Sequence, residues 1–456
     1  MKDNINLTEG KITTGLIKLA LPIIATNFIQ TAYGMVDMIW VGKIGSKAVA
    51  AVGTASFFIN LALALFAIIM IGSGVKIAQS VGANKKEETL IYIKNSFILS
   101  VILAVVYSIL IVVLKNKLIG FFQLNDIEIE KMAKDFLVYS AVGVIFMYFN
   151  SIQSTILNSF GNSKLPFKAN TIGFIANIIL DPILIFGVGP VAGMGVAGAA
   201  IATNLSRIIV FIIFIFTAKE YFSFKGVSVK FDFIKAKEVL KMGMPVSLQR
   251  VSFIGISIII ARLITSFGAT AIAVQKVGVQ LESVSYMAIG GIQGAIAAYV
   301  GQNYGAKKYK RIEKGYFSAL TTTIIFGLLI SIIFILFPKE LFSIFIQEQA
   351  AVDLGTNYMR ILGFSQVFMC MELLTVGAFN GVGKTYVPPI ISITFTALRI
   401  PMAMILSKDN ILGLNGIWAS ISLSSLIKGI ILVTWFIIFL RKTFVVDRRE
   451  QCNGKC

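Results

Sequence analysis

Long hydrophobic runs separated by short polar stretches dominate this chain. Each run is long enough to cross the roughly 30 Å hydrocarbon core of a membrane as a helix. The pattern predicts twelve membrane spans, at about 15–41, 49–80, 92–114, 132–159, 167–188, 194–218, 239–267, 271–303, 315–337, 354–381, 387–407 and 414–440. The predicted fold class is therefore an all-α integral membrane protein with 12 transmembrane helices.

The composition supports a membrane protein and excludes several other classes. Hydrophobic residues make up 57% of the 456 residues and charged residues 14%, against roughly 45–50% and about 25% in soluble domains. The chain has no histidine, which removes His-ligated zinc sites and Ser-His-Asp triads. The three cysteines, Cys370, Cys452 and Cys456, form no disulfide framework. We expect no enzyme activity and no cofactor.

The formal net charge of +19 is explained mostly by membrane topology and not by a nucleic-acid partner. Basic residues concentrate in the loops after the sixth and eighth spans and at the C-terminus. This asymmetry is typical of cytoplasmic segments and predicts both termini inside a plasma membrane, most simply that of a bacterium. No nucleic-acid partner is expected, because no basic stretch is interleaved with aromatic residues on a soluble domain.

The sequence contains two copies of one unit. Sliding it by 223 residues places Lys18 and Pro22 on Lys241 and Pro245, and shifts of 222 and 218 align later motifs. Each copy holds six spans, an even number, so both enter the membrane from the same side. We expect two six-helix bundles related by a pseudo-twofold axis along the membrane normal. The expected domains are an N-lobe at 1–218, a cytoplasmic linker at 219–237, a C-lobe at 238–441 and a cytoplasmic tail at 442–456.

Polar residues within the spans of the N-lobe predict an ion-coupling site. Asp37, Asn177, Asp181 and Thr203 all lie in the outer halves of their spans, and Asn177 and Asp181 share a helix face. Pro182 has no N–H to offer the carbonyl of the residue four positions earlier. These oxygens suit Na⁺ or a proton shared by two carboxylates. A structural polar cluster satisfied by neighbouring helices is the alternative.

The C-lobe does not repeat these acids. The repeat places Ile260 and Ala403 where the N-lobe has Asp37 and Asp181. Its spans instead hold the basic residues Arg250, Arg262, Lys276, Arg360, Arg399 and Lys428, with the acids Glu282 and Glu372. Salt bridges and substrate contacts are both open for these charges. The candidates for contact with substrate or between the lobes are Glu282, Glu372, Arg399, Gln275, Met35 and Tyr33.

Several motifs make the chain resemble the multidrug and toxic compound extrusion (MATE) family. They are YGMVDMIWVGKIG in span 1, GNSKLP and NIILDPILIFG at span 5, GVAGAAIATNLS in span 6, VGQNYGAKK after span 8 and GVGKTYVP before span 11. The resemblance implies two bundles, alternating access, and export of cationic or amphipathic compounds against inward Na⁺ or H⁺. It also implies an N-lobe ion site at Asp37, Asn177, Asp181 and Thr203. Residues 249–253 of span 7 lack the acid of another branch of the family.

Other functions remain open from the sequence alone. The basic C-lobe suits a flippase or exporter of an anionic or lipid-linked metabolite. A membrane enzyme is disfavoured by the short loops and the missing histidine, and a passive channel by the duplicated lobes. The expected partners are small organic molecules and membrane lipid, and the expected oligomeric state is a monomer.

Overall fold

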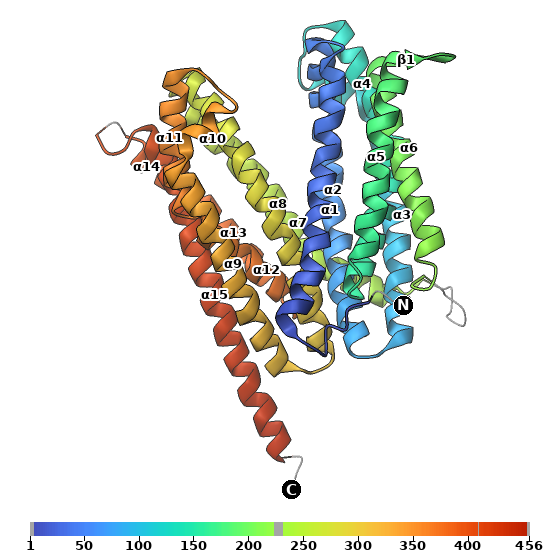
Figure 1. Ribbon diagram of the computed structural model, residues 1–456, viewed down its shortest axis with the longest axis vertical. Coiled ribbons are helices and arrows are strands. Elements are labelled where there is room, and N and C mark those ends of the chain that lie inside the picture. Colours follow the sequence, from blue (N-terminus) through green and yellow to red (C-terminus); the bar gives the residue numbers. More distant parts are fainter. Residues whose placement is uncertain (1–3, 223–230, 409, 454–456) are drawn as a thin grey trace. The chain divides into compact units, whose positions relative to one another are not determined.

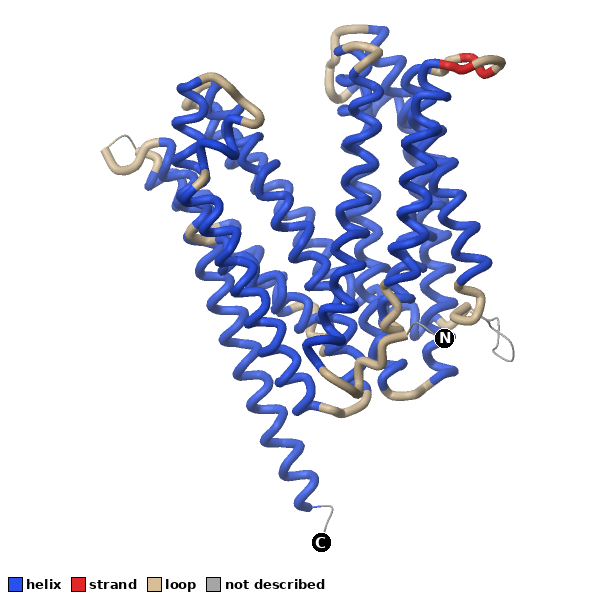
Figure 2. Tube along the Cα trace, viewed as in Figure 1, coloured by secondary structure: helices blue, strands red, loops and turns tan. Residues whose placement is uncertain are grey.

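The computed structural model describes residues 4–222, 231–408 and 410–453. Part of the predicted linker at 219–237 and the last three residues of the predicted tail, including Cys456, lie outside the described residues. The remaining chain is almost entirely helical, as Figure 2 shows by its colours.

The helices follow the predicted spans closely. Their bounds are α1 Ile12–Gly42, α2 Ser46–Gly82, α3 Lys86–Gly120, α4 Ile127–Ser159, α5 Lys164–Phe186, α6 Gly195–Thr217, α7 Phe233–Thr265, α8 Ala269–Gly305, α9 Tyr309–Leu336, α10 Pro338–Ser343, α11 Gln349–Gly363, α12 Gln366–Gly381, α13 Val387–Ala397, α14 Arg399–Leu406 and α15 Leu414–Asn453. Among the described residues, eleven segments are long and apolar enough to cross a membrane, with α13 and α14 counted together. The bent pair α11 and α12, at 50°, supplies the twelfth. The prediction of an all-α protein with twelve spans is confirmed.

Three local features were not predicted from the sequence. A two-stranded antiparallel hairpin, β1 Gly187–Val188 and β2 Val191–Ala192, joins α5 to α6, with Gly187 opposite Ala192; it stands at the end of α5 in Figure 1. The eleventh span is interrupted at Leu398, where Pro401 lacks the N–H that would bond to the carbonyl four residues earlier. Helix α15 continues to Asn453, through most of the predicted tail.

The chain divides into two compact units. Unit 1 contains residues 1–5 and Ala25–Gly243, and unit 2 contains Asn6–Ile24 and residues from Met244 onward. Within unit 1, α4 packs against α2, α3 and α6, and α5 packs against α6. Within unit 2, α12 takes the place of α4 and packs against α8, α9 and α15, while α14 packs against α15. The same packing therefore recurs in both units.

The backbone repeats with the same offsets as the sequence. Positive φ angles occur in pairs that match the duplicated motifs: Gly45 and Gly268, Asn84 and Lys307, Gly161 and Gly383, Gly195 and Gly413. A further pair, Gly198 and Gly416, lets a neighbouring backbone carbonyl approach so closely that a Cβ would lie 2.2 or 2.1 Å from it. Glycine is required at such contacts because any larger side chain would collide with the carbonyl.

The first part of α1 belongs to unit 2, and the first part of α7 belongs to unit 1. The division falls within α1, between Ile24 and Ala25, and within α7, between Gly243 and Met244. Prolines that are equivalent in the repeat, Pro22 and Pro245, lie beside these points. The contacts therefore differ from a simple split of the chain at the linker: residues 6–24 pack with unit 2 and residues up to 243 with unit 1.

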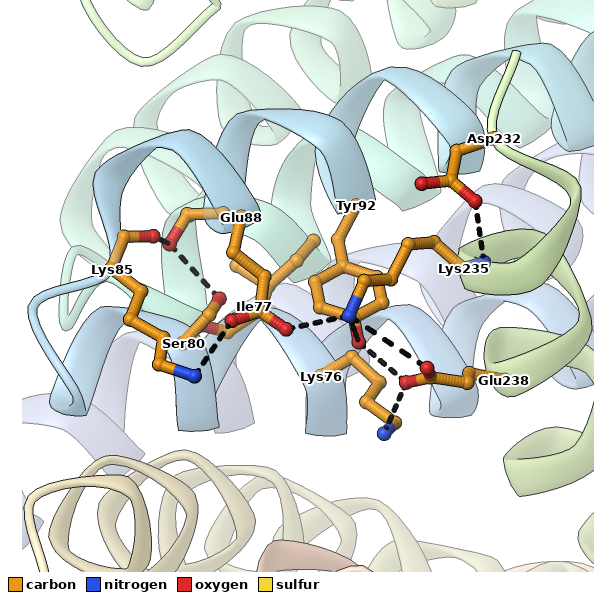
Figure 3. A network of polar contacts seen from close by, with 10 residues as sticks. Lys76, Ile77, Ser80, Lys85, Glu88, Tyr92, Asp232, Lys235 and Glu238 are labelled. Atoms are coloured by element: carbon orange, nitrogen blue, oxygen red, sulfur yellow. Dashed lines mark hydrogen bonds and ion pairs between the residues drawn. The ribbon is translucent and has the colours of Figure 1, made fainter.

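The beginning of α7 is held in unit 1 by a network of charged groups, drawn in Figure 3. Lys76 Nζ lies 2.6 Å from Glu238 Oε2, and the Tyr92 hydroxyl donates to the same oxygen at 2.5 Å. Lys235 Nζ lies 2.7 Å from Glu88 Oε1. Close backbone contact accompanies these pairs, since a Cβ on Gly243 would lie 1.7 Å from the Ile68 carbonyl oxygen.

The chain before α1 is held in unit 2 in a different way. The Arg311 guanidinium donates to the carbonyls of Leu7, Glu9 and Gly10, at 3.2, 2.5 and 3.0 Å. The Asn303 amide also donates to the Leu7 carbonyl, at 3.0 Å. Backbone acceptors thus replace the carboxylates that hold the beginning of α7.

Candidate functional site

The four residues predicted to couple to an ion meet inside unit 1. Asp37 comes from α1, Asn177 and Asp181 from α5, and Thr203 from α6. The Asn177 Nδ2 donates to Asp181 Oδ1 at 3.0 Å, and the Thr203 hydroxyl lies 3.0 Å from Asp37 Oδ2. The carboxyls of Asp37 and Asp181 are close enough to affect each other electrostatically, which joins the two halves of the cluster. Four polar side chains from three helices thus meet in one cluster.

Burial makes this cluster costly unless something else binds it. Asn177 and Asp181 are fully buried and Thr203 nearly so, whereas Asp37 is partly exposed. Three buried oxygens, Asp37 Oδ1, Asp181 Oδ2 and Asn177 Oδ1, have no hydrogen-bond partner among the described residues. A buried acceptor without a donor costs roughly 1–3 kcal/mol, and a charged one costs more. A proton or a small cation would satisfy these oxygens.

The Thr203 hydroxyl lies beside two hydrogen-bond acceptors if Asp37 is ionised. The same hydroxyl lies 3.0 Å from the Ala199 carbonyl oxygen and 3.0 Å from Asp37 Oδ2. A hydroxyl carries one proton, so it gives a full hydrogen bond to only one of the two acceptors. A proton on Asp37 resolves the conflict, because Asp37 then donates to Thr203, which donates to Ala199.

Local sequence explains how α5 presents its two residues. Asn177 and Asp181 are four positions apart and therefore lie one above the other on one helix face. Helix α5 continues through Pro182, so the ring interrupts one backbone hydrogen bond without ending the helix. The Ile178 carbonyl therefore receives no hydrogen bond from position 182, which adds a further available oxygen on the same helix.

One aromatic and one basic side chain lie beside the cluster. Tyr33, one turn before Asp37, stacks obliquely on Phe174 at 5.3 Å between ring centroids, and its hydroxyl lies against Gly173. Arg207, one turn after Thr203 on α6, lies within electrostatic range of Asp37 and Tyr33. The sequence analysis did not single out Arg207, although its spacing of four from Thr203 was the available signal.

Both acids within the C-lobe spans have a close polar partner. Lys428 Nζ lies 3.0 Å from Glu372 Oε2, both side chains are 7% exposed, and Ser392 donates to the other oxygen of Glu372 at 3.1 Å. Glu282 accepts from the Tyr358 hydroxyl at 3.1 Å. For Glu372, the structure thus shows the salt bridge that was one of the two alternatives.

Arg399 differs from the other charges in unit 2. Its guanidinium donates to the hydroxyls of Ser424 and Ser425, and no carboxylate among the described residues lies within 4 Å of it. Gln275 accepts from the Trp418 indole at 3.0 Å, while Met35 in unit 1 is 54% exposed. Contact of these residues with substrate stays a prediction.

A multidentate metal centre is not part of the described structure. No group of three or more His, Cys, Asp or Glu side chains gathers among the described residues. A cation at the N-lobe cluster would therefore be held by two carboxylates and neutral oxygens. Such a ligand set suits weakly held, exchangeable Na⁺ better than a resident transition metal.

The duplicated six-span units define a polytopic membrane transporter built from two copies of one bundle. The family model MatE matches residues 22–183 and 245–405, once in each copy. The chain belongs to this family, and its resemblance to MATE transporters is thereby confirmed.

Known proteins resemble the chain over nearly its whole length. The "Probable multidrug resistance protein NorM" of Thermotoga maritima is 28% identical over 94% of this chain and 92% of its own. A protein of Shewanella oneidensis named "FAD transporter" is 22% identical over 94% of this chain and 95% of its own. The structure titled "Crystal structure of MATE in the bent conformation" has a TM-score of 0.88 at 25% identity, covering 96% of this chain and 98% of that chain.

Proposed function

We propose that the chain is an antiporter that exports cationic or amphipathic organic compounds, driven by inward H⁺ or Na⁺. The carrying observation is the set of three partnerless buried oxygens on Asp37, Asn177 and Asp181, counted among the described residues. The name of the Thermotoga relative, "Probable multidrug resistance protein NorM", supports a substrate of this kind. The distribution of basic loops supports a cytoplasmic position for both termini and a place in the plasma membrane.

The coupling would proceed through the charge of the N-lobe cluster. Asp37 is partly exposed while Asp181 is buried, so Asp37 provides the route by which a proton or Na⁺ enters and leaves. With the ion bound, the two carboxylates no longer repel each other and can stay close. When the ion leaves, Arg207 balances part of the freed charge on Asp37. An ion that binds one conformation better than the other shifts the balance between them by that difference in affinity.

Efflux of ethidium from vesicles that contain the protein tests this proposal. An imposed pH gradient and an imposed Na⁺ gradient are compared for the wild type, Asp181→Asn and the surface control Asp353→Asn. Efflux driven by one gradient, lost in Asp181→Asn and kept in Asp353→Asn, is the expected result. Full efflux in Asp181→Asn would contradict the role of the cluster, and no efflux under either gradient would contradict cation export.

A second candidate function is export of an anionic compound. The observation that favours it is Arg399, a buried guanidinium whose contacts are two serine hydroxyls rather than a carboxylate. The Shewanella relative is named as a transporter of FAD, which is an anionic molecule. Under this proposal Arg399→Gln abolishes uptake of a flavin nucleotide into inverted vesicles and leaves ethidium transport unchanged. Equal flavin uptake by wild type and variant would rule it out.

A further inference from the structure

A basic cavity lies in unit 2, and its lining includes none of the residues of the N-lobe cluster. Its volume is about 660 Å³. The lining comes from the start of α1 and the start of α9: Gly10, Lys11, Ile12, Thr13, Thr14, Lys310, Arg311 and Lys314. Four of these side chains are cationic and none is acidic. Such a lining favours an anionic ligand.

The four cations have different roles. Arg311 is engaged with the three backbone carbonyls that precede α1, and so it builds one wall. The nearby carboxylate of Glu9 lies 3.9 Å from Lys308, outside the lining. Lys11, Lys310 and Lys314 are exposed and form no ion pair with another described residue. Three like charges that share one cavity repel each other, and a bound anion would relieve that repulsion.

The backbone adds to the positive potential. The 31-residue helix α1 begins at Ile12, so the first N–H groups of a long helix lie at the cavity wall. These groups have no partner inside the helix and attract phosphate and carboxylate groups. The Thr13 hydroxyl is bonded to Ser318 on α9, at 2.8 Å, which ties the two linings together.

The position of the cavity indicates where its ligand comes from. Both α1 and α9 are membrane-spanning segments, and the lining lies in the first turns of each. It therefore lies at the level of lipid headgroups rather than within the hydrocarbon. A volume of about 660 Å³ falls in the usual range of small-molecule sites and exceeds what inorganic phosphate fills. Basic clusters beside membrane spans attract anionic lipid.

We propose that this cavity binds the phosphate-bearing headgroup of an anionic phospholipid. Lys310, Lys314 and Lys11 contact the phosphate, and the N–H groups at the start of α1 face it. The inference is independent of the coupling ion and of the exported compound. In the proposed orientation the lipid belongs to the cytoplasmic leaflet, where the negative surface potential is found.

Lipid retention measured by native mass spectrometry tests the proposal. The detergent-purified full chain is titrated with dioleoylphosphatidylglycerol or dioleoylphosphatidylcholine. The wild type is compared with Lys310→Gln/Lys314→Gln, with the charge-retaining Lys310→Arg/Lys314→Arg, and with Lys86→Gln/Lys307→Gln. The last variant removes two exposed lysines near the same kinds of helix starts but outside the cavity lining.

We expect the wild type to retain phosphatidylglycerol in preference to phosphatidylcholine. Lys310→Gln/Lys314→Gln should bind it about tenfold more weakly or worse, whereas the Arg variant and the control should match the wild type. Equal retention by all four proteins would overturn the proposal. If the protein retains no phospholipid but binds glycerol 1-phosphate at millimolar concentration, the cavity takes a soluble phosphate instead, and the proposal of a lipid ligand is overturned. Ethidium efflux, measured separately, reports on the proposed function alone.

Discussion

The two units differ in how their buried acids are satisfied. Unit 1 hydrogen-bonds Asp37 and Asp181 to the neutral Thr203 and Asn177 and leaves three oxygens of the cluster unsatisfied among the described residues. Unit 2 closes Glu372 onto Lys428 and Ser392. The acids of unit 1 thus keep buried oxygens without a partner among the described residues, whereas the buried ion pair of unit 2 is already satisfied. Duplication therefore preserved the helix packing and left the polar side chains of the two copies free to diverge.

The most direct test of this difference is to neutralise the acidic cluster of unit 1 and the ion pair of unit 2 in separate variants and to measure transport. Asp37→Asn removes the partly exposed carboxylate of the open cluster. We expect it to lower gradient-driven ethidium efflux by more than about tenfold, because intramembrane acids of this kind carry ion movement. The double variant Glu372→Gln/Lys428→Met removes the closed pair together and should keep most of the efflux. Comparable losses in both proteins, at equal membrane insertion, would show that the C-lobe pair also takes part in coupling.

Breaking the closed pair from one side should have the largest effect on stability. Lys428→Met leaves the buried Glu372 carboxylate without its cation, which costs about 3–5 kcal/mol in comparable buried pairs. The midpoint of thermal unfolding in detergent measures this loss. The double variant Glu372→Gln/Lys428→Met should recover most of it. If Lys428→Met unfolds at the wild-type temperature, the pair contributes nothing to stability.

The charged network at the start of α7 should matter less, because water reaches it. Glu238 and Lys76 have side chains that are 33% and 18% exposed. Glu238→Gln should lower stability by roughly 1 kcal/mol, since partly screened pairs contribute little. The control is Glu87→Gln, an exposed acid in the first turn of α3. A loss as large as that of Lys428→Met would contradict the link between burial and cost.

The smallest effect is expected at the start of α4, where the ion pair is exposed. The Lys47 ammonium, 3.0 Å from Asp126, holds the pKa of that carboxyl below its usual range. Because the folded pKa is the lower one, the stabilisation is present above the unfolded value of about 3.9 and is lost as pH falls through the folded pKa. Unfolding midpoints recorded between pH 6 and pH 3 for wild type and Asp126→Asn should converge only at the acidic end. A constant difference over that range would exclude this pair as the cause.

Much of the fold and of the candidate site could be predicted from sequence, for identifiable reasons. Hydrophobic runs locate spans because the membrane requires each helix to satisfy its own backbone. The proximity of Asn177 and Asp181 follows from a spacing of four on one helix. The pairing of Asp37 with Thr203 was expected from their similar depth and is present.

What could not be predicted depends on contacts between distant segments. The break between α11 and α12 has no proline within it, and the last carbonyl of α11, on Gly363, accepts from the Ser331 hydroxyl of α9 instead. Arg207 lies one turn after Thr203, but its approach to Asp37 also depends on how α6 packs in unit 1, which local spacing does not specify. The exchange of the first parts of α1 and α7 likewise depends on close backbone contacts, such as that of Gly72 with Val239. Periodicity describes one helix at a time and does not specify which neighbour it meets.

The exchange of helix beginnings has a consequence for how the chain is made. Residues 6–24 are synthesised first, yet their partners in unit 2, such as Gly291 against Ile24, come from the second half of the chain. Unit 1 can complete its contacts once Gly243 has been made, whereas unit 2 has to recover a segment inserted long before. A ribosome that stalls within the second half therefore leaves the first span half-packed, and the two halves expressed as separate fragments each lack a piece of their own core.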